Sequence, residues 1–299
     1  MSISDVAPKS DRVALAVSVM VVTDLTLSIA DAIIKVTIAD MPLSQFIVLR
    51  SCITLPMLIM LRWRLPQISL RPIHLRWSVL RSALLLSSLL LYYASLPHLD
   101  LSMVAAVYYT IPIFITLFSA VWIRERMGAK GWLGLVLGFG GVLLMMKPQA
   151  GDLTMHTLMP LAAAILYAIA MVLTRTRNRG ENPFVLALLF NLLALVLGGL
   201  AGLANLWIGE AGALAGNWLS AGDIPWPLIL LLSMTMLIGS VGTAVAYQLG
   251  PPALISTWDF SYLAFAVVWG VVFFSERLDA ASIVGIVLIP LAGFIVLRR

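Results

Sequence analysis

Four polar side chains interrupt the first long apolar stretch of the chain at helical spacing. In steps of 4, 3 and 4 residues, the stripe consists of Asp24, Ser28, Asp31 and Lys35. Carboxyl groups in apolar surroundings are suited to holding the ammonium group of a substrate or a coupling proton. The structural alternative is an internal ion pair: Asp31 with Lys35 one turn on, or the stripe with Arg50 or Arg81.

Aromatic side chains and another acid occur at two places separated by 151 residues. These residues are Tyr108, Tyr109, Trp258, Asp259 and Tyr262. Pro112 lacks the amide that would pair with the Tyr108 carbonyl, which leaves a polar atom that must face protein or water. Rings at both places are suited to an aromatic binding site that stacks on a substrate ring or holds a cation against π faces. The alternative is that the rings only fill the membrane core.

Further polar side chains lie on helical stripes of other apolar segments. We include Tyr92, Tyr167 and Tyr247 as cavity-lining candidates. Arg50 and Arg81 also lie within apolar segments, where a charge costs about 2.5–3.5 kcal/mol, and we treat them as candidates for membrane-embedded ion pairs. Serine and threonine near these stripes equally serve to join helices.

Several kinds of chemistry lack the residues they need. The three histidines, His74, His98 and His156, have no metal-ligand spacing, so we predict no metal. A phosphate-cradling glycine loop is missing, and we predict no cofactor and no ATP hydrolysis. Asp31 with Asp259 is the best candidate for an intramembrane acid pair, which keeps an enzyme as a distant alternative. A receptor or assembly factor would need a larger surface outside the membrane.

The composition indicates an integral membrane protein. Of 299 residues, 61% are hydrophobic and 11% are charged, and the mean hydropathy is +1.02. A soluble protein is roughly 45–50% apolar and about 25% charged. Stretches of about 20 apolar residues mark spanning helices. We predict an all-α integral membrane protein with ten transmembrane helices at 13–36, 43–61, 76–96, 101–122, 131–147, 155–174, 184–207, 226–247, 252–274 and 280–297.

The basic residues predict the orientation. Of 19 lysines and arginines, fourteen fall in the segments on the side of the N-terminus, three on the other side and two within spans. Because basic residues in short loops collect in the cytoplasm, we predict cytoplasmic termini and a bacterial-type inner membrane. The same clusters explain the net charge of +5 without a nucleic-acid partner.

The two halves of the chain resemble each other at a spacing of 151 residues. Glu125 and Arg126 correspond to Glu276 and Arg277, and Gly134 corresponds to Gly285. Five spans per half is an odd number, so we predict two inverted five-helix repeats, 1–150 and 151–299, around a central cavity. Residues 9–32 also have the pattern of a signal peptide, but the repeat needs the first span, so we expect it to be retained.

These motifs resemble the drug/metabolite transporter superfamily, EamA type. The resemblance rests on the five-plus-five spans, the Glu-Arg turns, the glycines around Gly138 and Arg50 in the second span. Within the superfamily the chain is most similar to YddG-type exporters of aromatic amino acids. The resemblance implies an exporter that works by alternating access.

We therefore predict a secondary-active exporter of amino acids, with a preference for aromatic ones. The alternative is an exporter of other small metabolites or cationic drugs. We expect a small-molecule substrate and membrane lipids as partners, no nucleic acid, and function as a monomer.

Overall fold

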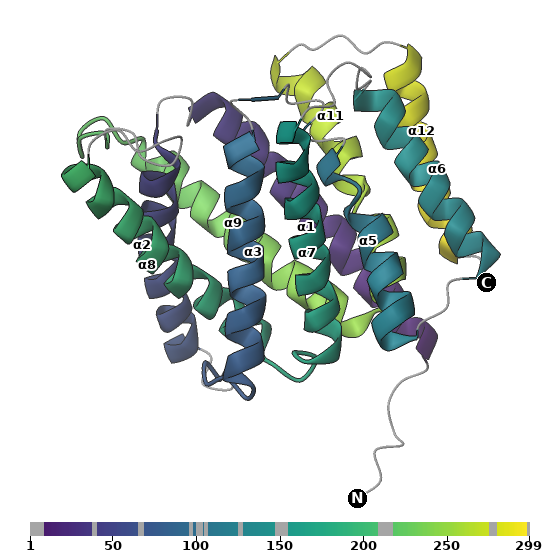
Figure 1. Cartoon of the computed structure of the whole chain (residues 1–299), viewed down its shortest axis with the longest axis horizontal. Helices are drawn as coiled ribbons and strands as arrows, with labels where there is room; N and C mark the ends of the chain where they lie inside the picture. Colours follow the sequence, from purple (N-terminus) through teal and green to yellow (C-terminus); the bar gives the residue numbers. More distant parts are fainter. Residues whose placement is uncertain are drawn as a thin grey trace, which may run out of the picture.

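The computed structural model describes residues 9–37, 41–64, 69–95, 98–99, 104, 107–124, 128–146, 155–208, 218–274 and 280–297. Within these ranges every regular element is a helix. The helices lie side by side in one bundle, with α2 and α8 at one edge and α6 and α12 at the other (Figure 1).

The helices follow the apolar segments of the sequence closely. They are α1 (Lys9–Thr37), α2 (Leu43–Arg64), α3 (Leu75–Ser95), α5 (Ile111–Phe118), α6 (Ala129–Met146), α7 (Leu158–Thr176), α8 (Pro183–Ile208), α9 (Trp226–Leu249), α10 (Pro252–Trp258), α11 (Ser261–Phe274) and α12 (Ala280–Leu297). A π-helical turn, Ser119–Ile123, continues α5, and a 3-10 turn, Met155–Thr157, precedes α7.

Among the described residues, seven segments are long and apolar enough to cross a bilayer. They are Val13–Ala30, Leu43–Arg64, Leu75–Ser95, Leu158–Thr176, Pro183–Leu203, Trp226–Leu249 and Pro252–Phe273. Three shorter apolar helices, Ile111–Ile123, Ala129–Leu144 and Ile283–Ala292, overlap the three remaining predicted spans. Large apolar side chains such as Val22, Leu200 and Val272 are more than half exposed, as lipid-facing residues are. The protein is a multi-pass membrane protein.

Two of the predicted spans are broken instead of continuous. Before α5 the chain turns at Tyr109 and Thr110, and Pro112 follows in the first turn of the helix, where its missing amide is tolerated. Between α10 and α11 the chain turns at Asp259 and Phe260, where no proline accounts for it. The sequence indicates the first break through Pro112, whereas it carries no signal for the second.

Helices from the two halves of the chain pack in reciprocal pairs. α1 packs on α9, and α3 packs on α7; α2 pairs with α8, and α6 with α12. Glycines permit the close contacts: a Cβ on Gly242 of α9 would overlap Thr23 Oγ1 of α1, and one on Gly141 of α6 would lie 2.9 Å from the Gly285 carbonyl oxygen of α12. The first and second halves are thus interleaved.

A group of buried hydrogen bonds made by Glu181 and Gln248, which we call the polar lock, joins the halves at one end of the bundle. The Glu181 carboxylate, 2% exposed, accepts the backbone N–H of Ile73 at 3.0 Å and that of His74, both just before α3. These amides belong to a helix start, whose partial positive charge suits a carboxylate. Gln248 at the end of α9 donates to the carbonyls of Asn178 and Glu181 at 2.7 and 2.9 Å. The loop between α7 and α8 therefore fixes the ends of α3 and α9.

Candidate functional site

Two acidic side chains from distant parts of the chain meet inside the bundle. Asp24 lies midway along α1 and is 1% exposed, and Asp259 lies in the break between α10 and α11. Their carboxyl groups lie close enough to interact electrostatically, and Oδ1 of Asp24 is buried without a hydrogen-bond partner. The Ser261 hydroxyl donates to Oδ2 of Asp24 at 2.7 Å, and the Tyr247 hydroxyl donates to Oδ2 of Asp259 at 3.2 Å. We call Asp24 and Asp259 the carboxyl pair.

The helix break positions the carboxyl pair. The Asp259 amide still bonds to the Ile255 carbonyl at 3.2 Å, and α11 begins two residues later at Ser261. Residues two apart on a continuous helix do not share a face. Because the helix is interrupted, Asp259 and Ser261 can both reach Asp24 on α1.

All seven tyrosines of the chain form one connected group around the carboxyl pair. In chain order they are Tyr92, Tyr93, Tyr108, Tyr109, Tyr167, Tyr247 and Tyr262. Ring centroids lie 4.7 Å apart for Tyr92 and Tyr108, and 6.3 Å apart for Tyr108 and Tyr167. Tyr109 stacks on Tyr262 at 5.9 Å with 25° between the ring planes. Tyr93 joins through Tyr92, and Tyr247 joins through Asp259. We call this group the tyrosine network.

The tyrosine network draws on helices of both halves. It takes side chains from α3, α7, α9 and α11 and from the turn before α5. Six of its seven members are half-buried, and only Tyr247 is fully buried. Trp258, at the end of α10, packs against the same apolar core as Tyr108 and Tyr167, and its Nε1 is buried with no hydrogen-bond partner. Chemically, the arrangement can stack on a ring or hold a cation against π faces beside a carboxyl group.

The two membrane-embedded arginines form no ion pair with a described acidic side chain. Arg81 on α3 donates from Nε to Thr174 Oγ1 on α7 at 2.6 Å. The Arg50 guanidinium on α2 lies over the rings of Phe46 and Phe190, at 5.9 and 5.3 Å from their centroids. Within the described part of the chain, the two guanidinium groups contact a hydroxyl acceptor and two aromatic faces. The predicted ion pairs stay a prediction.

The predicted polar stripe of α1 faces α11 over the part that is described. Asp24 accepts from Ser261, and the Ser28 hydroxyl accepts from Trp269 Nε1 at 3.0 Å. The side chains of Asp31 and Lys35 lie outside the described residues. The predicted ion pair between them, and a role for either, stay predictions.

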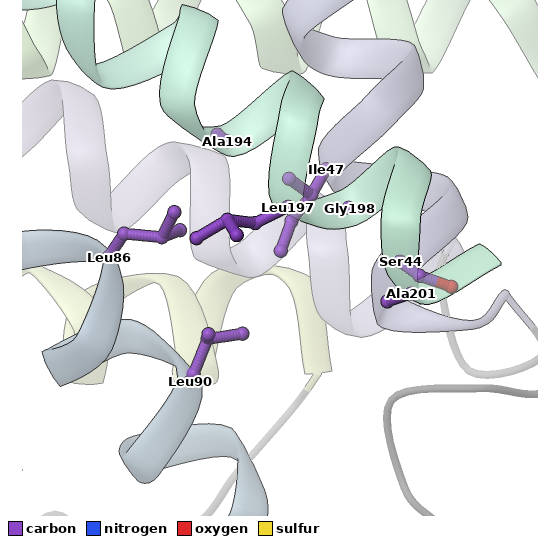
Figure 2. Close-up of a pocket in the computed structure, with 8 residues that line it drawn as sticks. All are labelled: Ser44, Ile47, Leu86, Leu90, Ala194, Leu197, Gly198 and Ala201. Carbon is purple, nitrogen blue, oxygen red and sulfur yellow. The ribbon is translucent and has the colours of Figure 1, made fainter. Parts of the chain in front are cut away.

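One small cavity lies away from the carboxyl pair, between α2, α3 and α8 (Figure 2). It measures about 50 Å³ and is lined by Ser44, Ile47, Leu86, Leu90, Ala194, Leu197, Gly198 and Ala201. Sites for organic ligands are roughly 300–1,000 Å³ and include a few polar groups. This cavity is too small and too apolar for a solute site, and the predicted central cavity stays a prediction.

The structure also brings together residues that the sequence did not connect. The His98 and His156 rings, 58 residues apart in the sequence, stack at 4.3 Å with 14° between the ring planes. Stacked rings do not point their nitrogens at a common ion. Within the described ranges, no group of three or more His, Cys, Asp or Glu side chains could hold a metal.

Comparison with known proteins agrees with this fold. Residues 14–147 match the EamA-like transporter family. The resemblance to EamA-type transporters is confirmed over this part of the chain. A solved crystal structure superposes with a TM-score of 0.76 over 95% of each chain at 18% identity, which establishes the fold alone.

Curated proteins that resemble the chain are named as transporters of differing solutes. The pseudopaline exporter CntI of Pseudomonas aeruginosa is 24% identical over 91% of this chain and 92% of its own. A riboflavin transporter of Brucella anthropi is 25% identical over 75% of each chain. An S-adenosylmethionine uptake transporter of Rickettsia bellii is 19% identical over 73% of this chain and 71% of its own. The narrower resemblance to YddG-type aromatic exporters is not supported by these relatives.

Proposed function

We propose that this chain is a secondary-active transporter that exports small organic solutes across a bacterial-type inner membrane. In this proposal, residues 1–150 and 151–299 are inverted five-helix halves that rock to open a central site to either side. The observation that carries the proposal is the carboxyl pair at a helix break, surrounded by the tyrosine network. Transport, not catalysis, is also the function named for the relatives.

Reciprocal helix packing and the matching bounds of corresponding helices support the inverted halves. Adding 151 to the bounds of α6, 129–146, gives 280–297, which are the bounds of α12. The same shift moves the start of α3 at residue 75 to the start of α9 at residue 226. The breaks at 109–110 and 259–260 match within one residue. Broken helices of corresponding position are where secondary transporters bind their solutes.

The site favours solutes that carry a positive charge next to an aromatic or apolar group. A carboxyl group inside the membrane is expensive and is retained for a cation or a proton, and tyrosine faces attract both cations and rings. Aromatic amino acids have these features and are our first candidates. Other small metabolites or cationic drugs are the alternative, which the variety of solutes named for the relatives favours.

Proton exchange is the proposed source of coupling. Two neighbouring carboxylates in an apolar interior repel each other when both are ionised, so one of the carboxyl groups is expected to hold a proton. An ammonium group brings donors of its own and displaces that proton. The other titratable groups that interact electrostatically with the pair are Tyr109, Tyr167 and Tyr247, and Tyr167 also interacts with Arg81.

Transport in proteoliposomes tests the proposal. Labelled amino acids, amines, drugs and sugars are offered to wild-type protein and to Asp24→Asn and Asp259→Asn. We expect a solute to cross chemically unaltered, each variant to fold but lose roughly tenfold or more of the rate, and the pH dependence to flatten. Asp223→Asn, which alters a carboxylate in an exposed loop, is the matched control. Wild-type rates in both carboxyl-pair variants would overturn the proposed site.

A further inference from the structure

Arg81 is a buried cation with unused hydrogen-bonding capacity. Its side chain is 1% exposed, although it sits on α3 in the membrane-spanning part of the bundle. Nε donates to Thr174 Oγ1 at 2.6 Å, whereas Nη1 is buried and has no hydrogen-bond partner. The Thr174 hydroxyl in turn donates to the Ala170 carbonyl at 2.8 Å, which fixes the orientation of the acceptor. One edge of the guanidinium is therefore held, and Nη1 remains free to bind.

No described acidic side chain compensates this charge. The structure describes four of them: Asp24, Glu181, Asp223 and Asp259. Asp24 and Asp259 form the carboxyl pair, Glu181 caps the start of α3, and Asp223 bonds to Ser220. A buried guanidinium without an anion is strongly unfavourable, and buried charges in proteins are as a rule paired.

The position of Arg81 relates it to the carboxyl pair through Tyr167. Thr174 and Tyr167 are seven residues apart on α7, so they share the face that packs on α3. Tyr167 lies within electrostatic reach of Arg81 and also of Asp24 and Asp259. The same tyrosine is therefore near both the cationic group and the carboxyl pair.

We propose that Arg81 binds an anionic group of the transported solute, with Thr174 as its positioning residue. The inference rests on the proposed function, which places the solute at the carboxyl pair. It deepens that function by naming the solute class: a zwitterion whose positive group is held at the carboxyl pair and whose carboxylate is held by Arg81. Arginine suits this task because its fork of N–H donors matches a carboxylate.

Arg50 differs from Arg81 in how its charge is compensated. Nε and Nη2 of Arg50 are also buried without a hydrogen-bond partner, but its guanidinium lies against the rings of Phe46 and Phe190, and aromatic faces attract a cation directly. Among the described residues no ring takes that place at Arg81, whose Nε donates to a single hydroxyl oxygen. The anion site is therefore assigned to Arg81 alone.

Matched pairs of solutes that differ by one carboxylate test the proposal. Phenylalanine is compared with phenethylamine, and para-aminomethylbenzoate with benzylamine, as stabilisers of the full-length protein against heat in detergent. In the wild type, the carboxylate-bearing member of at least one pair is expected to bind roughly tenfold more tightly. Arg81→Gln abolishes the difference within that pair, and Arg81→Lys retains part of it. Arg177→Gln, an exposed arginine over the Trp77 ring, keeps the full difference.

A second variant separates a positioning role from a purely structural one. Thr174→Val removes the oxygen that holds Nε, so it reduces the preference for the carboxylate member, and Thr174→Ser restores it. Equal binding within every pair by the wild type, or an undiminished preference in Arg81→Gln, overturns the inference. The proposed function fails separately, when Asp24→Asn and Asp259→Asn leave transport unchanged.

Discussion

Among the described residues, the carboxyl pair and Arg81 make their hydrogen bonds to hydroxyl groups and not to opposite charges. The carboxyl pair receives hydrogen bonds from Ser261 and Tyr247, and Arg81 donates to Thr174. A hydroxyl offers one donor and accepts as well, so it stabilises a carboxyl group without neutralising it. Charges compensated in this way remain available to a solute, whereas a buried salt bridge would have to be broken first.

The ring of Tyr108 gives a prediction at this scale. Tyr108 contacts Tyr92 and Tyr167 and packs on the same apolar core as Trp258. We expect Tyr108→Ala to weaken transport of aromatic solutes more than that of aliphatic ones. The ratio of the two kcat/KM values should change roughly three- to tenfold, because ring pairs contribute about 0.5–1.5 kcal/mol beyond their buried area. Competition assays in proteoliposomes measure this ratio. Phe114→Leu, on the same core but outside the tyrosine network, is the control, and equal losses for both solute types would mean that the ring only packs helices.

The sequence predicts most members of this site but not their arrangement. Asp24, Asp259 and six of the seven tyrosines stand out as polar or aromatic residues in apolar runs, and Tyr93 was missed although it adjoins Tyr92. The contact between Asp24 and Asp259 spans 235 residues and depends on the packing of α1 against α11, for which the sequence carries no local signal. Asp31 stands out in the sequence through its spacing to Lys35, and spacing along one helix says nothing about partners on another.

At the scale of elements, the helix ends and breaks determine where polar groups can lie. Apolar runs and basic loops predict the helices well, and Gly250 with two prolines marks the turn between α9 and α10. The break at Asp259 lacks such a marker, because neither Asp259 nor Phe260 forces a turn. Phe260 is fully buried against Gly138 of α6, so tertiary packing holds the break in place.

The contact of α1 with α9 can be tested by a size change and its compensation. Gly242→Ala places a methyl group on Thr23, next to Asp24. We expect a loss of thermal stability and of transport, because an extra methyl group in a well-packed contact lowers the stability by about 1–3 kcal/mol. Thr23→Ala removes the clashing oxygen and should restore both in the double variant, as coupled neighbours do. Gly199→Ala has open space around it and serves as control. Additive losses in the double variant would show that the two helices are not held by this contact.

The polar lock at Glu181 gives a second prediction for an element. Glu181→Gln keeps the shape but replaces one carboxylate oxygen by a donor, so one of the amides before α3 loses its acceptor. We expect a loss of about 1–3 kcal/mol, read as a lower melting temperature in detergent. Asn182→Ala, which removes an acceptor from the Phe184 amide in the same loop, tests whether any loop change has this effect. An unchanged melting temperature for Glu181→Gln would mean that the amides find other acceptors.

At the scale of the molecule, the basic residues set a topology that labelling can check. With Cys52→Ser as background, single cysteines are placed at Ser69 and Ala221, both exposed in loops. The positive-inside rule leads us to expect labelling from the periplasm at position 221 and only after permeabilisation at position 69. The reverse pattern would contradict the cytoplasmic termini and the inverted halves together. Labelling of both from one side would contradict the number of spans between them.

The gathering of every tyrosine in one network has a spectroscopic consequence. If the protein is produced with fluorotyrosine in place of tyrosine, all seven fluorine nuclei report from the same region, and no tyrosine elsewhere contributes background. A fluorine spectrum of the whole membrane protein is then a spectrum of its interior alone. Solutes can then be screened by the changes in chemical shift that they cause. The screen needs no knowledge of the transported solute and no engineered labelling site.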